Sequence, residues 1–245
     1  MQERNAFVET ADGKMETFIV HPDEAGPYAP VVMYQNVSGL SDSMRMMARR
    51  VAAQGYYCVV PDLYYRLGKI VIDADSAAEH VLAIRNAAIK SLRNTAVMED
   101  TRALLKFIQS DRVVRPRPAA VVGYCMGGRF SLLAAAHFPS QIAAAASLFG
   151  VGLITDAPDS PHLMFGKMRG EVYCGFAEHD PFAPPEFVKR FTELLERCNT
   201  VHSLVEVHPG SHHGYAFPGR PTYQKEAAER SWERIFAMFG RQLSQ

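Results

Sequence analysis

The chain has 245 residues, of which 48% are hydrophobic and 21% charged, so there is enough apolar material for one large core. Its 26 Lys and Arg residues balance 26 Asp and Glu residues, and the formal net charge is zero. This balance argues against a nucleic-acid partner, which usually leaves a basic excess or a basic patch. Because α/β folds of this length are often one unit, we expect a single domain over residues 1–245.

Two features of the sequence predict a cytoplasmic location and no membrane partner. Residues 1–20 alternate polar and apolar side chains and lack the unbroken apolar stretch of a signal peptide. No apolar run reaches the roughly 18 residues that are needed to cross a bilayer.

The four cysteines form no C-x-x-C pair and no metal-ligand spacing. Cys58 and Cys174 lie in apolar, strand-like runs, where we expect small buried hydrophobic side chains.

The predicted elements alternate between strands and helices along the chain. In order, the first half contains two short strands around a tight turn at residues 11–14, a strand at 31–34, a helix at 41–54, a strand at 56–60, and helices at 75–91 and 95–110. The second half contains a strand at 119–123, a helix at 126–137, strands at 142–149 and 171–177, a helix at 184–198, a strand at 203–207 and an amphipathic helix at 222–242.

The pattern of these elements predicts the fold class. After the first hairpin the strands are near-continuous apolar runs, as expected when helices cover both faces of a sheet. The sequence therefore predicts an α/β fold with a mostly parallel central sheet and helices on both faces. Residues 150–169, rich in Asp, Pro and Gly, form the longest irregular stretch, and loops of this size are often functional.

The segment at residues 120–133 predicts a nucleophile. An apolar strand runs into G-x-C-x-G-G and then into a helix, which is the context of the G-x-S-x-G nucleophile elbow with Cys125 in place of Ser. Gly123 and Gly127 remove Cβ atoms that would collide in this sharp turn. The turn leaves the Cys125 thiol at a helix N-terminus, where the dipole favours the thiolate. A buried cysteine in an ordinary glycine-rich turn is the alternative, and the flanking strand and helix favour catalysis.

An elbow nucleophile needs an acid and then a histidine further along the chain. Asp180 follows a strand and precedes a turn that prolines hold, which limits its freedom, so we predict that it is the acid. Glu178 is the competing carboxylate in the same turn. The other possibility is that both carboxylates are merely solvated.

The base is predicted among three histidines that lie within six residues. Gly214 follows His213 and would let the loop turn this ring back over the elbow, whereas His208 and His212 are less well placed. His213 is therefore the predicted base, with His212 left open as an alternative and a surface histidine cluster as the simpler interpretation. No acidic or cysteine residue completes a metal-ligand pattern here, so no metal site is predicted.

The string G-Y-C-M-G-G, the turn at Asp180 and the segment P-G-x-x-H-G together resemble the dienelactone hydrolase family. Residues 35–40 and 56–65 are similar to the same family, so the resemblance covers roughly residues 31–243. It implies an α/β-hydrolase fold and hydrolysis of a carboxylic ester or lactone through a thioester on Cys125. It also implies an oxyanion hole that is formed by the backbone N–H groups of Val37 and Met126.

Two positions depart from the family pattern. Asn36 stands where well-known members carry a Glu that interacts with the resting thiol, and Asn cannot accept a proton. Phe217 stands where they carry an Arg for a substrate carboxylate, with Arg220 three residues on, so we expect a pocket less selective for anions. The side chains that are candidates to line the substrate pocket are Asn36, Tyr64, Tyr124, Phe149, Phe182 and Phe217.

Three functions are compatible with these residues. The leading hypothesis is a Cys125–His213–Asp180 hydrolase of a small ester or lactone, which needs no cofactor because the triad is chemically complete and no G-x-G-x-x-G or P-loop string occurs. A non-catalytic protein that binds a small ligand is the second, suggested by Asn36. A redox-sensing thiol is the third, although no resolving cysteine is evident nearby. The pattern leaves open a monomer or a homodimer.

Overall fold

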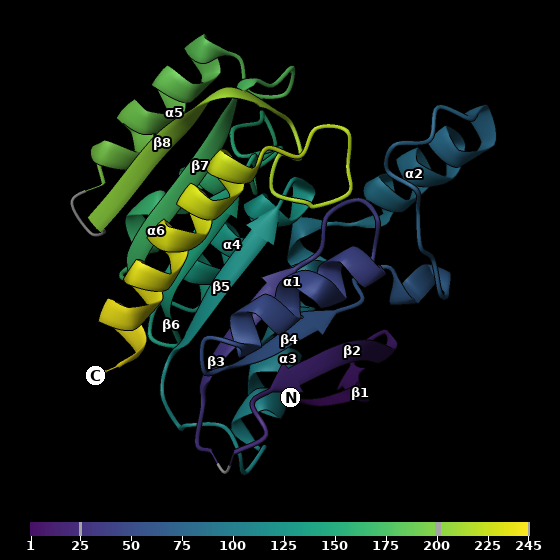
Figure 1. Cartoon of the computed structure of the whole chain (residues 1–245), viewed down its shortest axis with the longest axis vertical. Helices are drawn as coiled ribbons and strands as arrows, with labels where there is room; N and C mark the ends of the chain where they lie inside the picture. Colours follow the sequence, from purple (N-terminus) through teal and green to yellow (C-terminus); the bar gives the residue numbers. More distant parts are fainter. Residues whose placement is uncertain (25, 199–201, 245) are drawn as a thin grey trace. The chain divides into compact units, whose positions relative to one another are not determined.

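The structure is a computed structural model that describes residues 1–24, 26–198 and 202–244. The chain forms two compact units, Met1–Arg117 and Pro118–Gln245, which follow one another along the colour scale of Figure 1. Each unit contains neighbouring strands with helices packed against them. The single domain over residues 1–245 stays a prediction.

The strands of the first unit lie in the order β1-β2-β4-β3. β1 (Gln2–Thr10) and β2 (Gly13–His21) are the predicted hairpin, and β2 also pairs antiparallel with β4 (Tyr56–Pro61). β4 then pairs in parallel with β3 (Ala29–Tyr34). Every residue of β3 is buried, which explains why its sequence is apolar without alternation.

Helices cover the strands of the first unit. α1 (Asp42–Ala52) begins after Ser41, whose side chain accepts the Met44 N–H at 3.4 Å, and it packs against β2 and β4. α3 (Asn94–Gln109) packs against β1 and lies behind the strands in Figure 1, whereas α1 lies in front of them. Between them, η1 (Tyr65–Leu67) is a short 3-10 helix, and α2 (Glu79–Ser91) buries only its Ala88 side chain.

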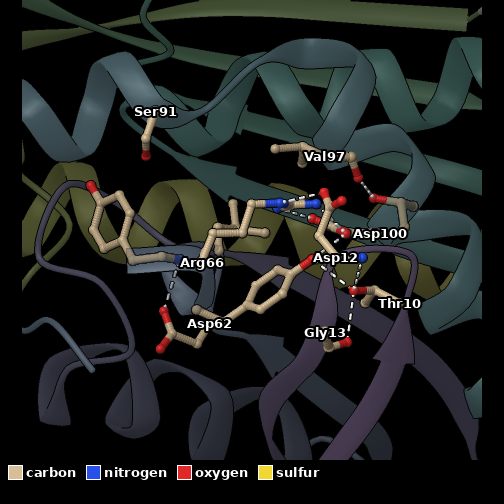
Figure 2. A network of polar contacts seen from close by, with 12 residues as sticks. Thr10, Asp12, Gly13, Asp62, Arg66, Ser91, Val97 and Asp100 are labelled. Atoms are coloured by element: carbon tan, nitrogen blue, oxygen red, sulfur yellow. Dashed lines mark hydrogen bonds and ion pairs between the residues drawn. The ribbon is translucent and has the colours of Figure 1, made fainter. Parts of the chain in front are cut away.

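An ion pair between Arg66 in η1 and the buried Asp100 in α3 connects these two helices (Figure 2). Arg66 donates to the two carboxylate oxygens of Asp100 at 2.8 and 2.9 Å and to Asp12, in the β1–β2 turn, at 2.7 Å. The Tyr65 hydroxyl also donates to Asp100, at 2.9 Å, and lies 2.7 Å from the Thr10 hydroxyl. Because the Asp100 side chain is only 2% exposed, these donors take the place of water around its carboxylate oxygens. The network thus joins the hairpin, η1 and α3.

The second unit contains four parallel strands in the order β5-β6-β7-β8. They are β5 (Ala119–Tyr124), β6 (Ile142–Leu148), β7 (Glu171–His179) and β8 (His202–His212). Parallel neighbours have their carboxyl ends at the same edge of the sheet, and in α/β folds this edge carries the functional site. The residues that follow β5, β7 and β8 are therefore brought toward one another.

Helices pack on these strands from two sides. α4 (Met126–His137) packs against β5 and β6, and α6 (Lys225–Leu243) packs across β5 to β8. Figure 1 shows α6 in front of the strands and α4 behind them. α5 (Pro185–Glu196) contacts β8 and the 3-10 helix η2 (Pro161–Lys167). Among the helices of the described ranges, none is long and apolar enough to cross a bilayer.

The largest differences from the predicted elements lie in β8, in α2 and in residues 150–169. β8 continues to His212 rather than ending at 207, because its pairing with β7 resumes after a register shift and His179 pairs with His212. α2 begins at Glu79 rather than at 75, because the side chains of Asp73 and Ser76 accept the N–H groups of Asp75 and Ala78 and compete with the helix. Residues 150–169 are not wholly irregular, since they contain η2.

Candidate active site

Cys125 occupies a strained turn between β5 and α4. Its backbone φ of 54° and ψ of −122° lie outside the regions that non-glycine residues usually adopt, at a cost of about 1–3 kcal/mol. The turn is held by backbone hydrogen bonds on both sides, because Cys125 N–H donates to Leu148 at 3.0 Å and its carbonyl accepts from Gly128 and Val151 at 3.0 Å. Cys125 is also the N-cap residue of α4.

Two glycines make this turn sterically possible. A Cβ at Gly123 would collide with the backbone of Gly127 and Gly128. A Cβ at Gly128 would collide with the Ser147 side chain and come within 2.8 Å of the Cα of Gly150. The collision predicted at Gly123 is therefore present, and Gly128 has a role that the sequence analysis did not assign.

Asp180 directly follows β7, and a short turn fixes its carboxylate. One oxygen accepts the Phe182 N–H at 2.9 Å, and the Asp180 carbonyl accepts the Ala183 N–H at 3.1 Å. The other oxygen lies 2.8 Å from Nδ1 of His213, and the Asp180 side chain is fully buried. The carboxylate is therefore held in one orientation toward the imidazole ring.

His213 directly follows β8 and contacts Asp180 through Nδ1. Burial lowers its pKa, but the influence of Asp180 and of Cys125 outweighs burial and raises the pKa from 6.5 to about 9. Near neutral pH the ring is consequently protonated when its partners are in place. An imidazolium between a carboxylate and a sulfur is the arrangement that stabilises a thiolate nucleophile.

The competing candidates lie away from this pair. The Glu178 side chain is half exposed and accepts the Gly210 N–H at 2.6 Å, so it joins β7 to β8. His212 is exposed and its ring lies 5.1 Å from the ring of His179. Asp180 and His213 are the two residues that the structure brings into contact, whereas Glu178 and His212 are not part of that contact.

His208 belongs to a buried polar chain under the loop that carries His213. Its Nε2 lies 3.1 Å from the hydroxyls of both Tyr173 and Ser231, and Ser231 lies 2.9 Å from the Tyr215 hydroxyl. Burial is the largest influence on the His208 pKa and lowers it, so the ring is neutral. Because Tyr215 is two residues after His213 and fully buried, this chain anchors the histidine loop to α6.

The aromatic pocket candidates of the second unit divide into two groups. Tyr124, Phe149 and Phe217 are buried together, with ring centroids 5.0 to 6.3 Å apart. Phe182 is 56% exposed, and its ring lies 5.0 Å from that of His213. The roles of these four residues toward a substrate stay predictions. Phe217 itself is fully buried, so the side chain at position 217 lies in the core.

Comparison with known proteins identifies the family. The profile of the dienelactone hydrolase family matches residues 15–243. The chain belongs to the dienelactone hydrolase family. It is, accordingly, a dienelactone hydrolase-like hydrolase of the ester and lactone class.

Individual members of the family are distant in sequence. Two curated relatives, each named provisionally as a carboxymethylenebutenolidase, come from Synechocystis and Yersinia pestis. The first is 26% identical, over 92% of this chain and 91% of its own length, and the second is 28% identical, over 92% and 83%. A crystal structure from Klebsiella pneumoniae, named provisionally as a dienelactone hydrolase, has a TM-score of 0.85 at 23% identity over 98% of both chains. The fold of this dienelactone hydrolase family member is therefore the α/β-hydrolase fold.

The positions at which this chain departs from the family pattern can be located within each unit. Asn36 is buried in the first unit, and its side-chain oxygen accepts the Ser38 N–H at 2.9 Å. Tyr64 is fully buried there and donates to the Val37 carbonyl at 3.2 Å. The proposed roles of Asn36, Val37 and Tyr64 at the site stay predictions. In the second unit, Arg220 lies against the backbone next to His213, since a Cβ at Gly214 would be 2.9 Å from its Nη1.

Within residues 1–24, 26–198 and 202–244, no three His, Cys, Asp or Glu side chains are grouped as ligands for a metal ion. The described site brings together a sulfur at a helix N-terminus, an imidazole with a raised pKa and a buried carboxylate.

Sequence reasoning missed the residues that support the site from behind. Tyr215 and Ser231 carry no motif, because a hydroxyl on an apolar helix face or loop has the same appearance whether or not it is buried. Phe149 was already a pocket candidate, but its positive φ of 38°, which is rare for a residue with a Cβ, could not be predicted from the local sequence. The one available signal was the clustering of aromatic residues around His213 in the sequence.

Proposed function

We propose that this chain hydrolyses a small carboxylic ester or lactone through a thioester on Cys125, with His213 as acid and base and Asp180 orienting it. The contact between Asp180 and His213 at 2.8 Å is the observation that supports this most directly. The raised pKa of His213, to which Asp180 and then Cys125 contribute, agrees with it. Membership of the dienelactone hydrolase family and the names of the relatives support the same class of substrate.

In the first half-reaction, the Cys125 thiolate bonds to the carbonyl carbon of the substrate and the carbonyl electron pair moves onto oxygen. The Met126 N–H at the start of α4 is the proposed first oxyanion donor, and Val37 is the second that the family resemblance implies. When the intermediate collapses, the bond to the alcohol oxygen breaks and His213 gives that oxygen its proton. For a lactone, the alcohol stays attached to the acyl chain.

In the second half-reaction, neutral His213 takes a proton from water as the water oxygen bonds to the thioester carbon. Collapse of the intermediate breaks the carbon–sulfur bond and releases the carboxylic acid, which loses its proton to solvent. The thiolate and the imidazolium are thereby restored. Asp180 stabilises the positive ring in both halves, because its carboxylate bonds Nδ1 and directs Nε2 toward the reacting atoms.

The proposal is tested by Cys125→Ala and Cys125→Ser on an activated aryl ester and on a dienelactone. Wild type should hydrolyse at least one substrate, with a thioester adduct on Cys125 visible by mass spectrometry after rapid quenching. Cys125→Ala should lose at least about 1,000-fold in kcat, because the covalent route is gone. The buried Cys174→Ala is the matched control and should retain activity, since this thiol is far from solvent and burial raises its pKa.

Full activity in Cys125→Ala would refute the thioester mechanism. A wild type that is never acylated by any ester, but binds the same compounds reversibly, would instead support the non-catalytic alternative. The ratio of the two wild-type rates shows whether the site still favours the lactone.

A further inference from the structure

The His213 ring contacts two phenyl rings from separate segments. The Phe149 centroid lies 5.1 Å from that of His213 with an interplanar angle of 69°. The Phe182 centroid lies 5.0 Å away with an angle of 66°. Both contacts are edge-to-face, which is a favoured arrangement for aromatic pairs.

Phe149 is fixed by its backbone as well as by its packing. It follows β6 with a φ of 38° and is 1% exposed, so a strained residue is fully enclosed. Its N–H donates to the Gly175 carbonyl at 2.7 Å, and its ring packs edge-on against Tyr215 at 5.1 Å. Strain that persists in a buried non-glycine residue indicates that the surrounding contacts require this position.

The Tyr215 contact ties Phe149 to the loop that carries His213. A Cβ at Gly175 would lie 2.8 Å from the Tyr215 hydroxyl, so glycine at this position lets the tyrosine pack closely. Tyr215 is anchored at its hydroxyl by Ser231. Phe149 is therefore held in place by β6, which it follows, by β7 through Gly175, and by α6 through Tyr215 and Ser231.

Phe182 is fixed by the same turn that fixes the acid. Its N–H donates to one oxygen of Asp180, while the other oxygen of that carboxylate binds His213. The residue that holds the acid thus also carries the second ring. The Phe182 side chain is 56% exposed, and its contact with His213 is the ring–ring pair at 5.0 Å.

We propose that Phe149 and Phe182 are positioning residues that prevent rotation of the His213 ring away from Asp180 and Cys125. An imidazole must keep Nδ1 on the carboxylate and Nε2 on the sulfur, and rotation about its side-chain bonds would break one of these contacts. Rotation of the ring would disturb its edge-to-face contacts with both phenyl groups, and one of these groups, Phe149, is fully buried. This inference rests on the proposed triad and adds two residues to it.

The test compares Phe149→Leu and Phe182→Leu with matched controls. Phe165→Leu is the control for the buried ring, because Phe165 is also 1% exposed and contacts Phe191 rather than His213. Phe187→Leu is the control for the other ring, because it is half-buried and contacts other phenylalanines. Each variant is measured for kcat and KM on the same aryl ester and for thermal unfolding.

Each of Phe149→Leu and Phe182→Leu should lower kcat about 3- to 10-fold with little change in KM. The kcat of each control should stay within twofold of the wild-type kcat, even where the control loses as much thermal stability as the variant it is matched with. Phe182→Tyr should restore kcat, because it keeps the ring and adds a hydroxyl at an exposed position. In Phe149→Leu the pKa of His213, followed by NMR, should fall from about 9 toward 6.5 as its hydrogen bonds weaken.

A rise in KM with unchanged kcat would overturn the proposal and assign these rings to substrate contact. Equal loss of kcat in the controls would also overturn it, because the effect would then follow core stability. Failure of the proposed function would be recognised by a different result, because Cys125→Ala would then stay active. If Cys125→Ala is inactive while both leucine variants match wild type, only the positioning role is wrong.

Discussion

Asp180→Asn removes one negative charge and preserves the size of the side chain. The rise of the His213 pKa from 6.5 to about 9 corresponds to about 3 kcal/mol, and Asp180 and Cys125 share it. A hydrogen bond to a charged group is worth about 1.5–3 kcal/mol, so losing the carboxylate should account for about half of the rise or more. At about 1.4 kcal/mol for each factor of ten, kcat should fall about 10- to 100-fold.

The assay is single-turnover acylation and steady-state kcat on an aryl ester at pH 7, with the His213 pKa followed by NMR. The pKa should fall in Asp180→Asn, because the favourable charge is lost while burial, which lowers it, remains. Glu178→Gln is the matched control, since this carboxylate lies two residues earlier and binds Gly210 instead of His213. Asp180→Asn within threefold of wild type, or Glu178→Gln equally inactive, would refute the reasoning.

Two further predictions concern pH and the first unit. The proton on His213 stabilises the folded state below its unfolded pKa of about 6.5, and this stability is lost as pH rises through about 9. Denaturant titrations should therefore show that the unfolding free energy of wild type falls between these two pH values, and that it falls by less in Cys125→Ala. The pH–rate profile should show that kcat falls above pH 9. Arg66→Ala leaves the Asp100 carboxylate, whose side chain is 2% exposed, without its bidentate partner. The first unit should lose about 3 kcal/mol in urea unfolding, and an unchanged midpoint would show that water reaches Asp100.

Much of the fold was predictable because its signals are local. The strand–turn–helix at Cys125 is encoded by an apolar run, a glycine at position 123 that must lack a Cβ, and a helix that follows at once. The start of α1 was also local, since Ser41 caps it. These features need only neighbours within a few residues, so the sequence predicts them well.

The errors occurred where distant neighbours decide the structure. Residues 208–212 contain Pro and Gly and have the composition of a loop, yet pairing with β7 extends β8 to His212. This extension determines which histidine leaves the strand: His208 turns into the core beneath the loop, and His213 comes after the last paired residue. The choice of His213 among three histidines depends on a register that the local sequence does not contain.

The strained residues of the second unit show how the sheet supports chemistry. Cys125 and Phe149 both have positive φ, and both lie directly after parallel strands, at the edge where strands end. Each is held by a backbone hydrogen bond to the neighbouring strand: Cys125 N–H to the Leu148 carbonyl, and Phe149 N–H to the Gly175 carbonyl. The ladder that pairs β5 with β6 and β6 with β7 thus continues one residue beyond the strands, into the conformations that chemistry needs. Because these bonds belong to the sheet, Cys125 and Phe149 keep their positions relative to each other. Under the proposed mechanism, the substrate range can therefore change through the surrounding side chains while the thiol keeps its place.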